Sequence, residues 1–227
     1  MKLLELLRNN VNENDRIIGR KKYFNSSVLV ALCSIDGILH FILQKRSPHI
    51  RQGSEISFPG GGYEEKDGNF LETAVRETNE ELGIARHKIE VLGKVGTMII
   101  PTGVLVEAYM GYIHIDSTDE FCINTDEVEK LIFVPVDFFR TTEPRIEKIG
   151  LTAHPTYTEE GIIKNFPAKE LNLPEIYHKP WSGKPRKVHF FFYEGEVIWG
   201  ITADVIIDVI DLIDEYENKL MSGDYNE

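Results

Sequence analysis

The chain has 227 residues, of which 42% are hydrophobic and 27% are charged, and its formal net charge is −12. This composition is typical of a globular protein with one sizeable domain. A surface this acidic excludes broad binding to nucleic acid or to an anionic membrane, because both need a continuous positive face. A small phosphorylated ligand stays compatible, since a few local cations or a bound metal can outweigh the overall charge.

The N-terminal residues predict a short amphipathic helix over 1–8, so that residues 1–20 form a helix and a linker. This stretch lacks the apolar core of a signal peptide, and no segment approaches the roughly 18 apolar residues of a membrane span. We therefore expect a soluble, cytoplasmic protein that binds neither nucleic acid nor membrane. A homodimer is compatible with the sequence, which leaves the oligomeric state open.

The next part of the chain predicts a hairpin and a long helix. The apolar, β-branched stretch at 27–34 is followed by Asp36-Gly37, a hairpin turn into a second strand at 38–46. Residues 48–62 contain six glycines or prolines and predict a loop. Apolar residues at helical spacing predict a helix over 69–82 that ends at Gly83.

The second half predicts three more strands, a hairpin and a closing helix. The six prolines of 141–187 indicate an irregular segment, either an insertion or a lid. VHFFFYEGEVIWGITA predicts a hairpin turning at Glu194-Gly195. We therefore expect an α+β fold, with a mixed sheet between helices, in a single domain over 21–220. The three strands are expected at 90–100, 105–115 and 130–135, and the helix at 204–220.

The two cysteines, Cys33 and Cys122, lie in apolar or mixed segments without C-x-x-C spacing. Free cysteine is among the most frequently buried residue types. We therefore expect two buried thiols rather than a disulfide or a pair of metal ligands.

The stretch RETNEELG, at 76–83, places Glu77, Glu80 and Glu81 within five positions. Residues four apart on a helix are offset by about 40°, so Glu77 and Glu81 share a face, and Glu80 reaches the same point from the side. Like charges at this spacing destabilise a helix, and a divalent cation removes that penalty. A solvated acidic face is the alternative explanation.

The preceding glycine-rich stretch FPGGG favours a metal and phosphate site over a solvated face. At Gly60 and Gly61 the backbone can approach a metal or a phosphate without a side chain in the way. Mg²⁺ prefers carboxylate ligands and keeps positions for water and phosphate oxygens. Arg76, adjacent to Glu77, is placed to orient a carboxylate.

These residues resemble a known motif, since Gly61 through Ile84 is similar to the Nudix box, G-x5-E-x7-R-E-U-x-E-E-x-G-U, with U a bulky apolar residue. The chain departs from the motif at Asp67, which replaces the Glu and is separated from Arg76 by eight residues rather than seven. Thr78 also stands where an apolar residue is usual. An Asp with one extra residue resembles the coenzyme A pyrophosphatase branch. The matching positions are Arg76, Glu77, Glu80, Glu81, Gly83 and Ile84.

Other segments also resemble this branch. LQKRSPHIRQGSEISFPGG is similar to its upstream signature, although the spacing from Arg51 to Phe58 is one residue short, so that the signature's Gly is displaced to Gly53 or replaced by Ser54. TGVLVEAYMGYI, NTDEVEKLIFVPV and YEGEVIWGITADVI resemble its later signatures, with Ala108 in place of a Pro. The upstream matches are Arg46, Ser47, Arg51 and the FPGG of 58–61.

The resemblance implies a Nudix-type α/β/α sandwich, with a mixed β-sheet between helices, and divalent-metal-dependent hydrolysis of a pyrophosphate bond in a nucleoside diphosphate derivative. For this branch the substrate is coenzyme A or one of its derivatives, cut to 3′,5′-ADP and 4′-phosphopantetheine. The implied cofactor is Mg²⁺ or Mn²⁺, which neutralises charge on the pyrophosphate and activates a water. The implied partner is a small-molecule nucleotide.

The resemblance also assigns roles to individual residues. The base is Glu80 or a glutamate outside the box, with Glu127 the first candidate and Glu107 the second. The expected metal ligands are Glu77, Glu80, Glu81 and Gly61. The expected catalytic residues are Glu77, Glu80, Arg76 and Glu127, and the expected substrate contacts are Arg46, Arg51, Gly60 and Gly61, with the two arginines on phosphates.

Two alternatives stay open. A Nudix pyrophosphatase of ADP-ribose, NADH or another dinucleotide or sugar nucleotide is compatible with the irregular upstream signature and with the unmatched 141–187 segment. A non-catalytic Nudix module that senses a nucleotide is the other, although such modules typically lose box glutamates, and all three remain here.

Overall fold

The computed structural model describes residues 17–222, so the helix expected over 1–8 lies outside the described residues. The described residues divide into two compact units, with the boundary between Val136 and Asp137. Whether they form the single domain expected over 21–220 stays a prediction. Within 17–222, no helix is both long enough and apolar enough to cross a lipid bilayer.

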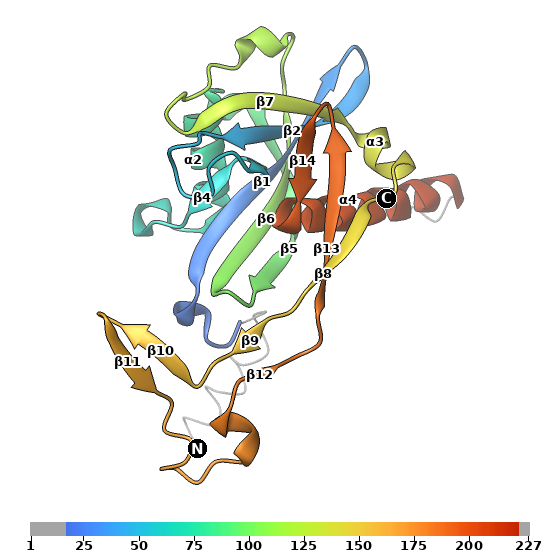
Figure 1. Ribbon diagram of the computed structural model, residues 1–227. Coiled ribbons are helices and arrows are strands. Elements are labelled where there is room, and N and C mark those ends of the chain that lie inside the picture. Colours follow the sequence, from blue (N-terminus) through green and yellow to red (C-terminus); the bar gives the residue numbers. More distant parts are fainter. Residues whose placement is uncertain (1–16, 223–227) are drawn as a thin grey trace, which may run out of the picture. The chain divides into compact units, whose positions relative to one another are not determined.

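The first unit is built on a seven-stranded mixed sheet (Figure 1). The strand order is β3-β2-β1-β6-β5, with β4 paired to β1 and β7 paired to β2. β1 and β6 run parallel, and the other pairs in this sheet are antiparallel. The strands are β1 (Phe24–Ile35), β2 (Ile38–Arg46), β3 (Ile56–Ser57), β4 (Gly60–Gly62), β5 (Ile89–Ile100), β6 (Val104–Ile113) and β7 (Val128–Pro135).

The predicted hairpin is confirmed, because Asp36 and Gly37 take φ values of 51° and 78°, as a two-residue turn between antiparallel strands needs. The strands expected at 90–100, 105–115 and 130–135 are present as β5, β6 and β7 with slightly different ends. The loop expected over 48–62 was wrong in part, since β3 and β4 lie in it. Three glycines form β4 because their backbone groups pair with β1, and a strand made of backbone alone gives no apolar pattern.

Helix α2 (Phe70–Leu82) packs on one face of this sheet. Its apolar side is buried against the alternate, same-face residues of β1. The prediction of a buried Cys33 is confirmed, and the prediction of a buried Cys122 was wrong, because its segment uses backbone groups to contact the helix and leaves the thiol exposed. The buried cluster consists of Leu29, Ala31, Cys33, Ile42, Ala74, Val75, Leu82, Ile84, Ile89 and Ile113.

The second unit contains all of α3 (Val136–Thr141) but its first residue, a three-stranded sheet and the long helix α4 (Gly200–Ser222), which begins before the expected 204. The hairpin predicted to turn at Glu194-Gly195 is confirmed as β13 and β14. A side-chain contact joins α4 to β13, because Oδ1 of Asp204 on the helix lies 2.8 Å from Nδ1 of His189 on the strand. The sheet order is β14-β13-β8, with β8 (Arg145–Ile149), β13 (Arg186–Tyr193) and β14 (Glu196–Trp199).

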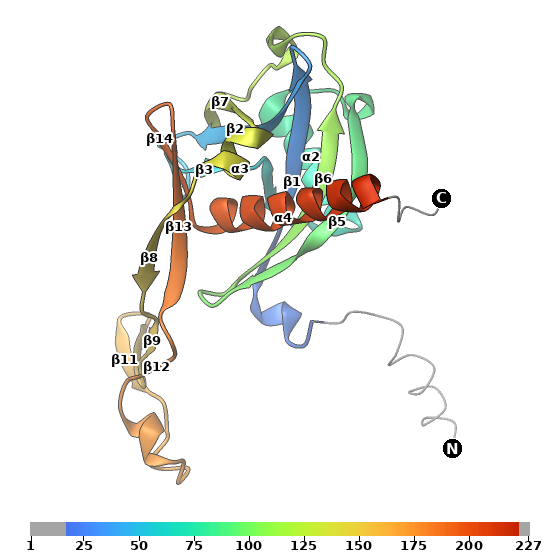
Figure 2. The same cartoon turned by 90° about the vertical axis from the view of Figure 1, so that its right-hand side faces the viewer.

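The segment expected to be irregular, 141–187, contains strands, which corrects that expectation. Beyond β8 and β13 the chain continues into two short antiparallel ribbons (Figure 2). Their side chains are almost all exposed. Their sequences therefore lack the alternation of apolar and polar residues by which a half-buried strand is predicted. The ribbons are β10 (Thr156–Glu159) with β11 (Ile162–Asn165), and β9 (Thr152–Ala153) with β12 (Trp181–Ser182).

The α+β class with a mixed sheet is therefore confirmed. The part of this fold that positions the candidate site is the first unit, where α2 lies against the sheet and contacts β4 and the residue that precedes β7.

Candidate metal and catalytic site

Helix α2 carries the glutamates of the sequence cluster and is fixed at both ends. Asn69 caps its N-terminus by accepting a hydrogen bond from the N–H of Glu72 at 3.0 Å. Gly83 ends it with a φ of 64°. A Cβ at Gly83 would lie 2.0 Å from the backbone oxygen of Cys122, so only glycine fits this close approach. The predicted helix over 69–82 and its C-terminal glycine are confirmed.

A loop from a distant part of the sequence is hydrogen-bonded to the end of α2. The N–H of Cys122 donates to the carbonyl oxygen of Leu82 at 3.1 Å, and the N–H of Asn124 donates to that of Glu81 at 3.0 Å. The last carbonyls of a helix have no partner within it, so these bonds satisfy groups that need one. Glu127 follows, and its N–H donates to the carbonyl of Asn124 at 3.0 Å. The loop that positions Glu127 is therefore anchored to the helix that carries Glu81.

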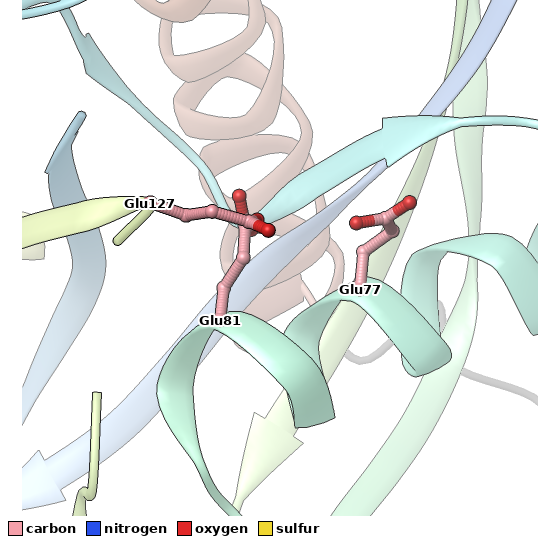
Figure 3. Close-up of side chains that lie close together, drawn as sticks. All are labelled: Glu77, Glu81 and Glu127. Atoms are coloured by element: carbon pink, nitrogen blue, oxygen red, sulfur yellow. The ribbon is translucent and has the colours of Figure 1, made fainter. Parts of the chain in front are cut away.

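The side chains of Glu77, Glu81 and Glu127 converge on one point (Figure 3). One carboxylate oxygen of each lies within 4.8 Å of the others. Glu77 and Glu81 rise from the same face of α2, as their spacing predicted, and Glu127 reaches toward Glu81 from the start of β7. Within the described residues, Glu80 and Glu107 do not belong to this group of three.

Burial makes the ionised form of two of these carboxylates unfavourable. Burial raises the pKa of Glu81 to about 7, although the Gly60 N–H, the Gln44 amide and the Arg46 charge all act to lower it. Only 2% of the Glu81 side chain is exposed, and its Oε2 accepts a hydrogen bond from the N–H of Gly60 at 2.8 Å. Burial also raises the pKa of Glu77, against the neighbouring Arg76 charge. A divalent cation would favour the charged form of both.

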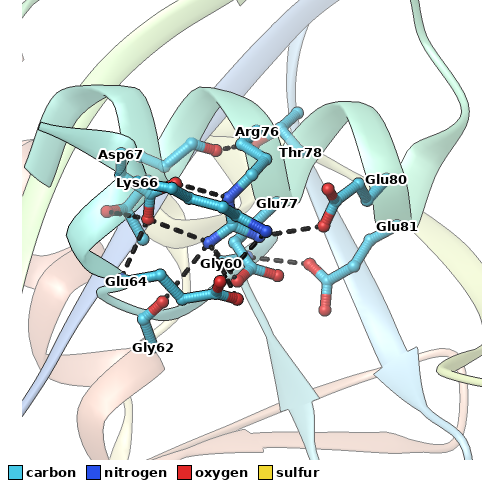
Figure 4. Close-up of polar contacts among 12 residues, drawn as sticks. Gly60, Gly62, Glu64, Lys66, Asp67, Arg76, Glu77, Thr78, Glu80 and Glu81 are labelled. Carbon is cyan, nitrogen blue, oxygen red and sulfur yellow. Dashed lines mark hydrogen bonds and ion pairs between the residues drawn. The ribbon is translucent and has the colours of Figure 1, made fainter.

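Arg76 holds the carboxylates around α2 in orientation, as the sequence predicted (Figure 4). Its NH2 lies 2.9 Å from Oε1 of Glu77, and its NH1 donates to Oε2 of Glu80 at 2.9 Å. Glu80 is thereby turned toward Arg76, and its side chain is 50% exposed. A metal-binding or base role for Glu80 stays a prediction.

Asp67, the departure from the box, is the main partner of Arg76. Arg76 donates from Nε to Oδ1 of Asp67 at 2.7 Å and from NH2 to Oδ2 at 3.0 Å, a bidentate pair. The hydroxyl of Thr73 and the N–H of Glu64 also donate to Oδ2, at 2.9 and 3.0 Å. The extra residue is accommodated by a 3₁₀ turn and by Gly68, at a φ of 74°. The shorter acidic side chain therefore still reaches the arginine.

The glycine-rich stretch lies directly against the carboxylates. A Cβ on Gly61 would lie 2.5 Å from Oε1 of Glu77, so the absence of a side chain leaves room for this carboxylate. A Cβ on Gly60 would lie 2.3 Å from the backbone oxygen of Ser27 and could not be accommodated without moving the strand. The structure brings both predicted glycines to the site, and their roles in binding metal and substrate stay predictions.

Of the three basic residues ahead of the box, one reaches the cluster. Arg46 NH1 lies 3.7 Å from Oε1 of Glu81. Lys45 pairs with Glu129 at 3.5 Å. Arg51 is exposed, and its guanidinium lies 5.8 Å from the ring centroid of Phe24. The structure therefore places Arg46, but not Arg51, beside the carboxylates.

Glu107 is buried in a separate ionic cluster. It pairs with Arg20, with Nζ of Lys94 at 2.6 Å and with the hydroxyl of Thr97 at 2.7 Å. Its carboxylate is therefore surrounded by donors from β5 and the start of the described chain. Of the two outside candidates for the base, Glu127 lies with the other carboxylates, and Glu107 does not.

Gln44 was missed by the sequence reasoning. Its side chain is fully buried and lies close enough to Glu81 to lower the pKa of that carboxyl, although burial has the larger, opposite effect. The available signal was its place in ILHFILQKR, where an uncharged polar residue follows six strand positions, five of them apolar. Such a residue in a buried strand needs a polar partner.

The donor set fits a hard divalent cation. Three carboxylates from two elements offer oxygen ligands, which Mg²⁺ and similar ions prefer. The glycines of β4 leave backbone without side chains beside the carboxylates, and Arg46 places a positive charge next to Glu81. The arrangement suits metal-assisted attack of water on a phosphate.

Comparison with known proteins agrees with this chemistry. The NUDIX domain family model matches residues 24–150. Nudix hydrolase 3 of Caenorhabditis elegans is 27% identical over 200 residues, which are 86% of this chain and 76% of that protein. The peroxisomal coenzyme A diphosphatase NUDT7 of Mus musculus is 34% identical over 114 residues, which are 50% of this chain and 48% of that protein.

Solved structures with detectable likeness include the NUDIX domain of Shewanella oneidensis NrtR, complexed with ADP ribose. It is 20% identical, the match covers 63% of this chain and 89% of that chain, and the TM-score is 0.42. The Ap4A hydrolase of C. elegans gives 16% identity, 49% and 80% coverage and a TM-score of 0.42. Since the family model matches more than half of the 227 residues, the chain belongs to the Nudix hydrolase family.

Proposed function

We propose that this protein hydrolyses the pyrophosphate bond of coenzyme A or one of its derivatives and releases 3′,5′-ADP and 4′-phosphopantetheine or its acylated form. The observation that carries the hydrolase chemistry is the convergence of Glu77, Glu81 and Glu127 within 4.8 Å. The substrate class is supported by the 34% identity to the mouse coenzyme A diphosphatase. The upstream arginine-serine pair and Asp67 in the box support the same class.

Nudix hydrolases generally use divalent metal ions. We propose Mg²⁺ or Mn²⁺ as the ion, held by Glu77, Glu81 and Glu127, with the carbonyl of Gly61 and the carboxylate of Glu80 as further ligands. When bound, the ion neutralises charge on the pyrophosphate and lowers the pKa of a water. Arg76 fixes Glu77, and the N–H of Gly60 fixes Glu81, so that both carboxylates are oriented before substrate arrives.

The reaction adds one water across the anhydride. The water oxygen forms a bond to one phosphorus, the bridging P–O bond breaks, and the other phosphate leaves with the bridging oxygen. Glu127 is our proposed acceptor of the water proton, because it is the glutamate outside α2 that joins the cluster. Arg46, 3.7 Å from Glu81, is placed to donate to a phosphate oxygen. Arg51 is proposed to contact a more remote phosphate.

The test is a hydrolysis panel of coenzyme A, acetyl-coenzyme A, ADP-ribose, NADH and diadenosine tetraphosphate, each with and without Mg²⁺ or Mn²⁺. We expect metal-dependent turnover, with a kcat/KM for a coenzyme A compound at least about tenfold above the other substrates. Comparable turnover across the panel would defeat the coenzyme A assignment. Turnover on none of these substrates would favour a nucleotide-sensing module.

A further inference from the structure

Gln44 on β2 is buried, and no hydrogen bond of normal geometry satisfies its amide within the described residues. Its side chain has no exposed area, and neither Nε2 nor Oε1 makes a hydrogen bond of normal geometry to any described residue. Buried polar atoms in native proteins are almost always satisfied, and an exception indicates a ligand, a water or a functional role. A glutamine amide has two donor hydrogens and two acceptor lone pairs, so the unmet capacity here is large.

A second unpartnered polar atom lies beside it. Gln44 is directly opposite Ser57 in the antiparallel pair of β2 and β3, so the two side chains point to the same face of the sheet. The hydroxyl oxygen of Ser57 is also buried without a partner. On the other side of Gln44 the opposite residue is Leu131, which offers no polar side-chain atom. The neighbouring strands therefore leave the Gln44–Ser57 pair unsatisfied.

This pair faces the candidate metal site. Arg46 lies two positions along β2, so it shares the face of Gln44, and it reaches to 3.7 Å from Glu81. Burial raises the pKa of Glu81 and the nearby Gln44 amide acts to lower it, so the amide lies next to that carboxylate although the two do not form a hydrogen bond of normal geometry. The pair thus approaches Glu81 from β2 and β3, while Glu127 approaches it from the residue before β7.

We propose that Gln44 and Ser57 are positioning residues that hold a water bound to the divalent ion at Glu81. The inference rests on the metal site of the proposed function. The chemistry of the pair selects water over two other occupants. A bare metal ion would use only oxygen lone pairs and leave the hydroxyl hydrogen of Ser57 unpaired, and a phosphoryl oxygen would use only donors and leave Oε1 of Gln44 unpaired. A metal-bound water gives a lone pair to the ion and donates two hydrogens, which Oε1 of Gln44 and Oγ of Ser57 can accept.

The test replaces the amide by a side chain of similar length without hydrogen-bonding groups, Gln44→Met. Leu43→Met is the matched control, because residue 43 is also fully buried in β2 but points to the opposite face. For each variant the measurements are the melting temperature of the metal-free protein, the Mn²⁺ dissociation constant by calorimetry, and kcat and KM separately.

For Gln44→Met we expect a metal-free melting temperature equal to or above wild type, because an unsatisfied buried amide is removed. We expect the Mn²⁺ dissociation constant to rise about tenfold, and kcat to fall by a similar factor with little change in KM. Ser57→Ala is expected to produce a smaller change in the same direction. Leu43→Met is expected to bind Mn²⁺ like wild type.

Wild-type Mn²⁺ affinity and kcat in Gln44→Met would overturn the inference while leaving the metal site intact. Failure of Gln44→Met to fold, together with wild-type Mn²⁺ affinity in Ser57→Ala, would also overturn it, because the pair would then be structural. Failure of the wild-type protein to bind Mn²⁺ would instead defeat the proposed function. The two failures are therefore distinguishable.

Discussion

Asp67 and Arg76 are joined by two hydrogen bonds, from Nε to Oδ1 at 2.7 Å and from NH2 to Oδ2 at 3.0 Å. The Asp67 side chain is 2% exposed and the Arg76 side chain 18% exposed, so the pair is largely shielded from water. Through this pair, the residue that departs from the family motif fixes the arginine that orients Glu77.

Replacement of Asp67 by Asn is expected to lower the free energy of unfolding by about 1–3 kcal/mol, because a charge-assisted bidentate pair is lost. Hydrogen bonding to Arg76 holds the pKa of Asp67 well below its ordinary value of 3.8. The ionised Asp67 therefore stabilises the folded state fully above pH 3.8, and this stabilisation is lost as the pH falls through the lower pKa of the folded state. Guanidinium unfolding of Asp67→Asn, with the exposed Asp116→Asn as control, measures the effect. Equal stability of the two variants near neutral pH would contradict it.

Glu81→Gln is expected to reduce kcat by a factor of about 100 or more, since a charged group at the reacting phosphate is removed. The metal-free protein should melt at the same or a higher temperature, because burial disfavours the ionised carboxylate in the folded state. Hydrolysis assays and thermal melts test both parts. Glu72→Gln, which also removes a carboxylate from the first turn of this helix but at a partly exposed position paired with Arg86, is the control. Full activity in Glu81→Gln would remove the metal assignment.

The stability of the metal-free protein is expected to fall as the pH rises from about 5 to about 7. Burial raises the pKa of Glu81 from 4.5 to about 7, so the folded state binds more protons than the unfolded state between these values. The stabilisation from protonated Glu81 is then complete below the pKa of this group in the unfolded state. It is lost as the pH rises through the pKa of the same group in the folded state. Thermal melts across this range measure it, with Glu81→Gln as the variant that should lack this component.

Mn²⁺ affinity should have the opposite pH dependence. The ion binds the deprotonated carboxylate, so below pH 7 its apparent affinity should rise up to about tenfold per pH unit and level off above. Calorimetry in buffers of different ionisation enthalpy would also detect the released proton. An affinity independent of pH below 7 would show that Glu81 is not a ligand.

Two adjacent glycines are expected to respond differently to alanine. In Gly61→Ala the added Cβ meets the flexible end of Glu77 at 2.5 Å, so Mn²⁺ affinity should fall about tenfold with little loss of stability. In Gly60→Ala it meets the backbone oxygen of Ser27 at 2.3 Å, so stability should fall by about 1–3 kcal/mol. Gly62→Ala, with Phe24 at 3.1 Å, is the mild control. Identical profiles of the first two variants would contradict the distinction.

Glu107→Gln separates the two outside candidates for the base. Glu107 is held by Arg20, Lys94 and Thr97, so the change is expected to lower the free energy of unfolding by about 1–3 kcal/mol and to leave kcat nearly unchanged. Glu127→Gln should instead reduce kcat by a factor of about 100 or more. A severe loss of kcat in a folded Glu107→Gln would reverse the assignment.

Helix α2 and the direction of its glutamates could be predicted, because both follow from local spacing. Glu77 and Glu81 are four apart, and helix geometry alone brings them to one face. The presence of Glu127 beside them could only be proposed by resemblance. Its position depends on backbone hydrogen bonds between 122–124 and the end of α2, which leave no trace in residue periodicity.

The missed features also depend on contacts between distant segments. Gln44 lies beside Glu81 only because β2 and α2 meet, and Glu107 is neutralised by Arg20 from a segment 87 residues away. The ribbons within 141–187 expose both faces, so they have no alternation of apolar and polar residues to reveal them.

The exposed Cys122 gives direct experimental access to the metal centre. Cys33 is buried, and burial raises the pKa of its thiol to about 11, so a thiol reagent at neutral pH should modify Cys122 alone. The backbone of Cys122 is hydrogen-bonded to α2 one residue beyond Glu81. A nitroxide attached there would thus sit on the segment that leads to Glu127, and paramagnetic broadening by Mn²⁺ would report occupancy of the cluster without any substrate.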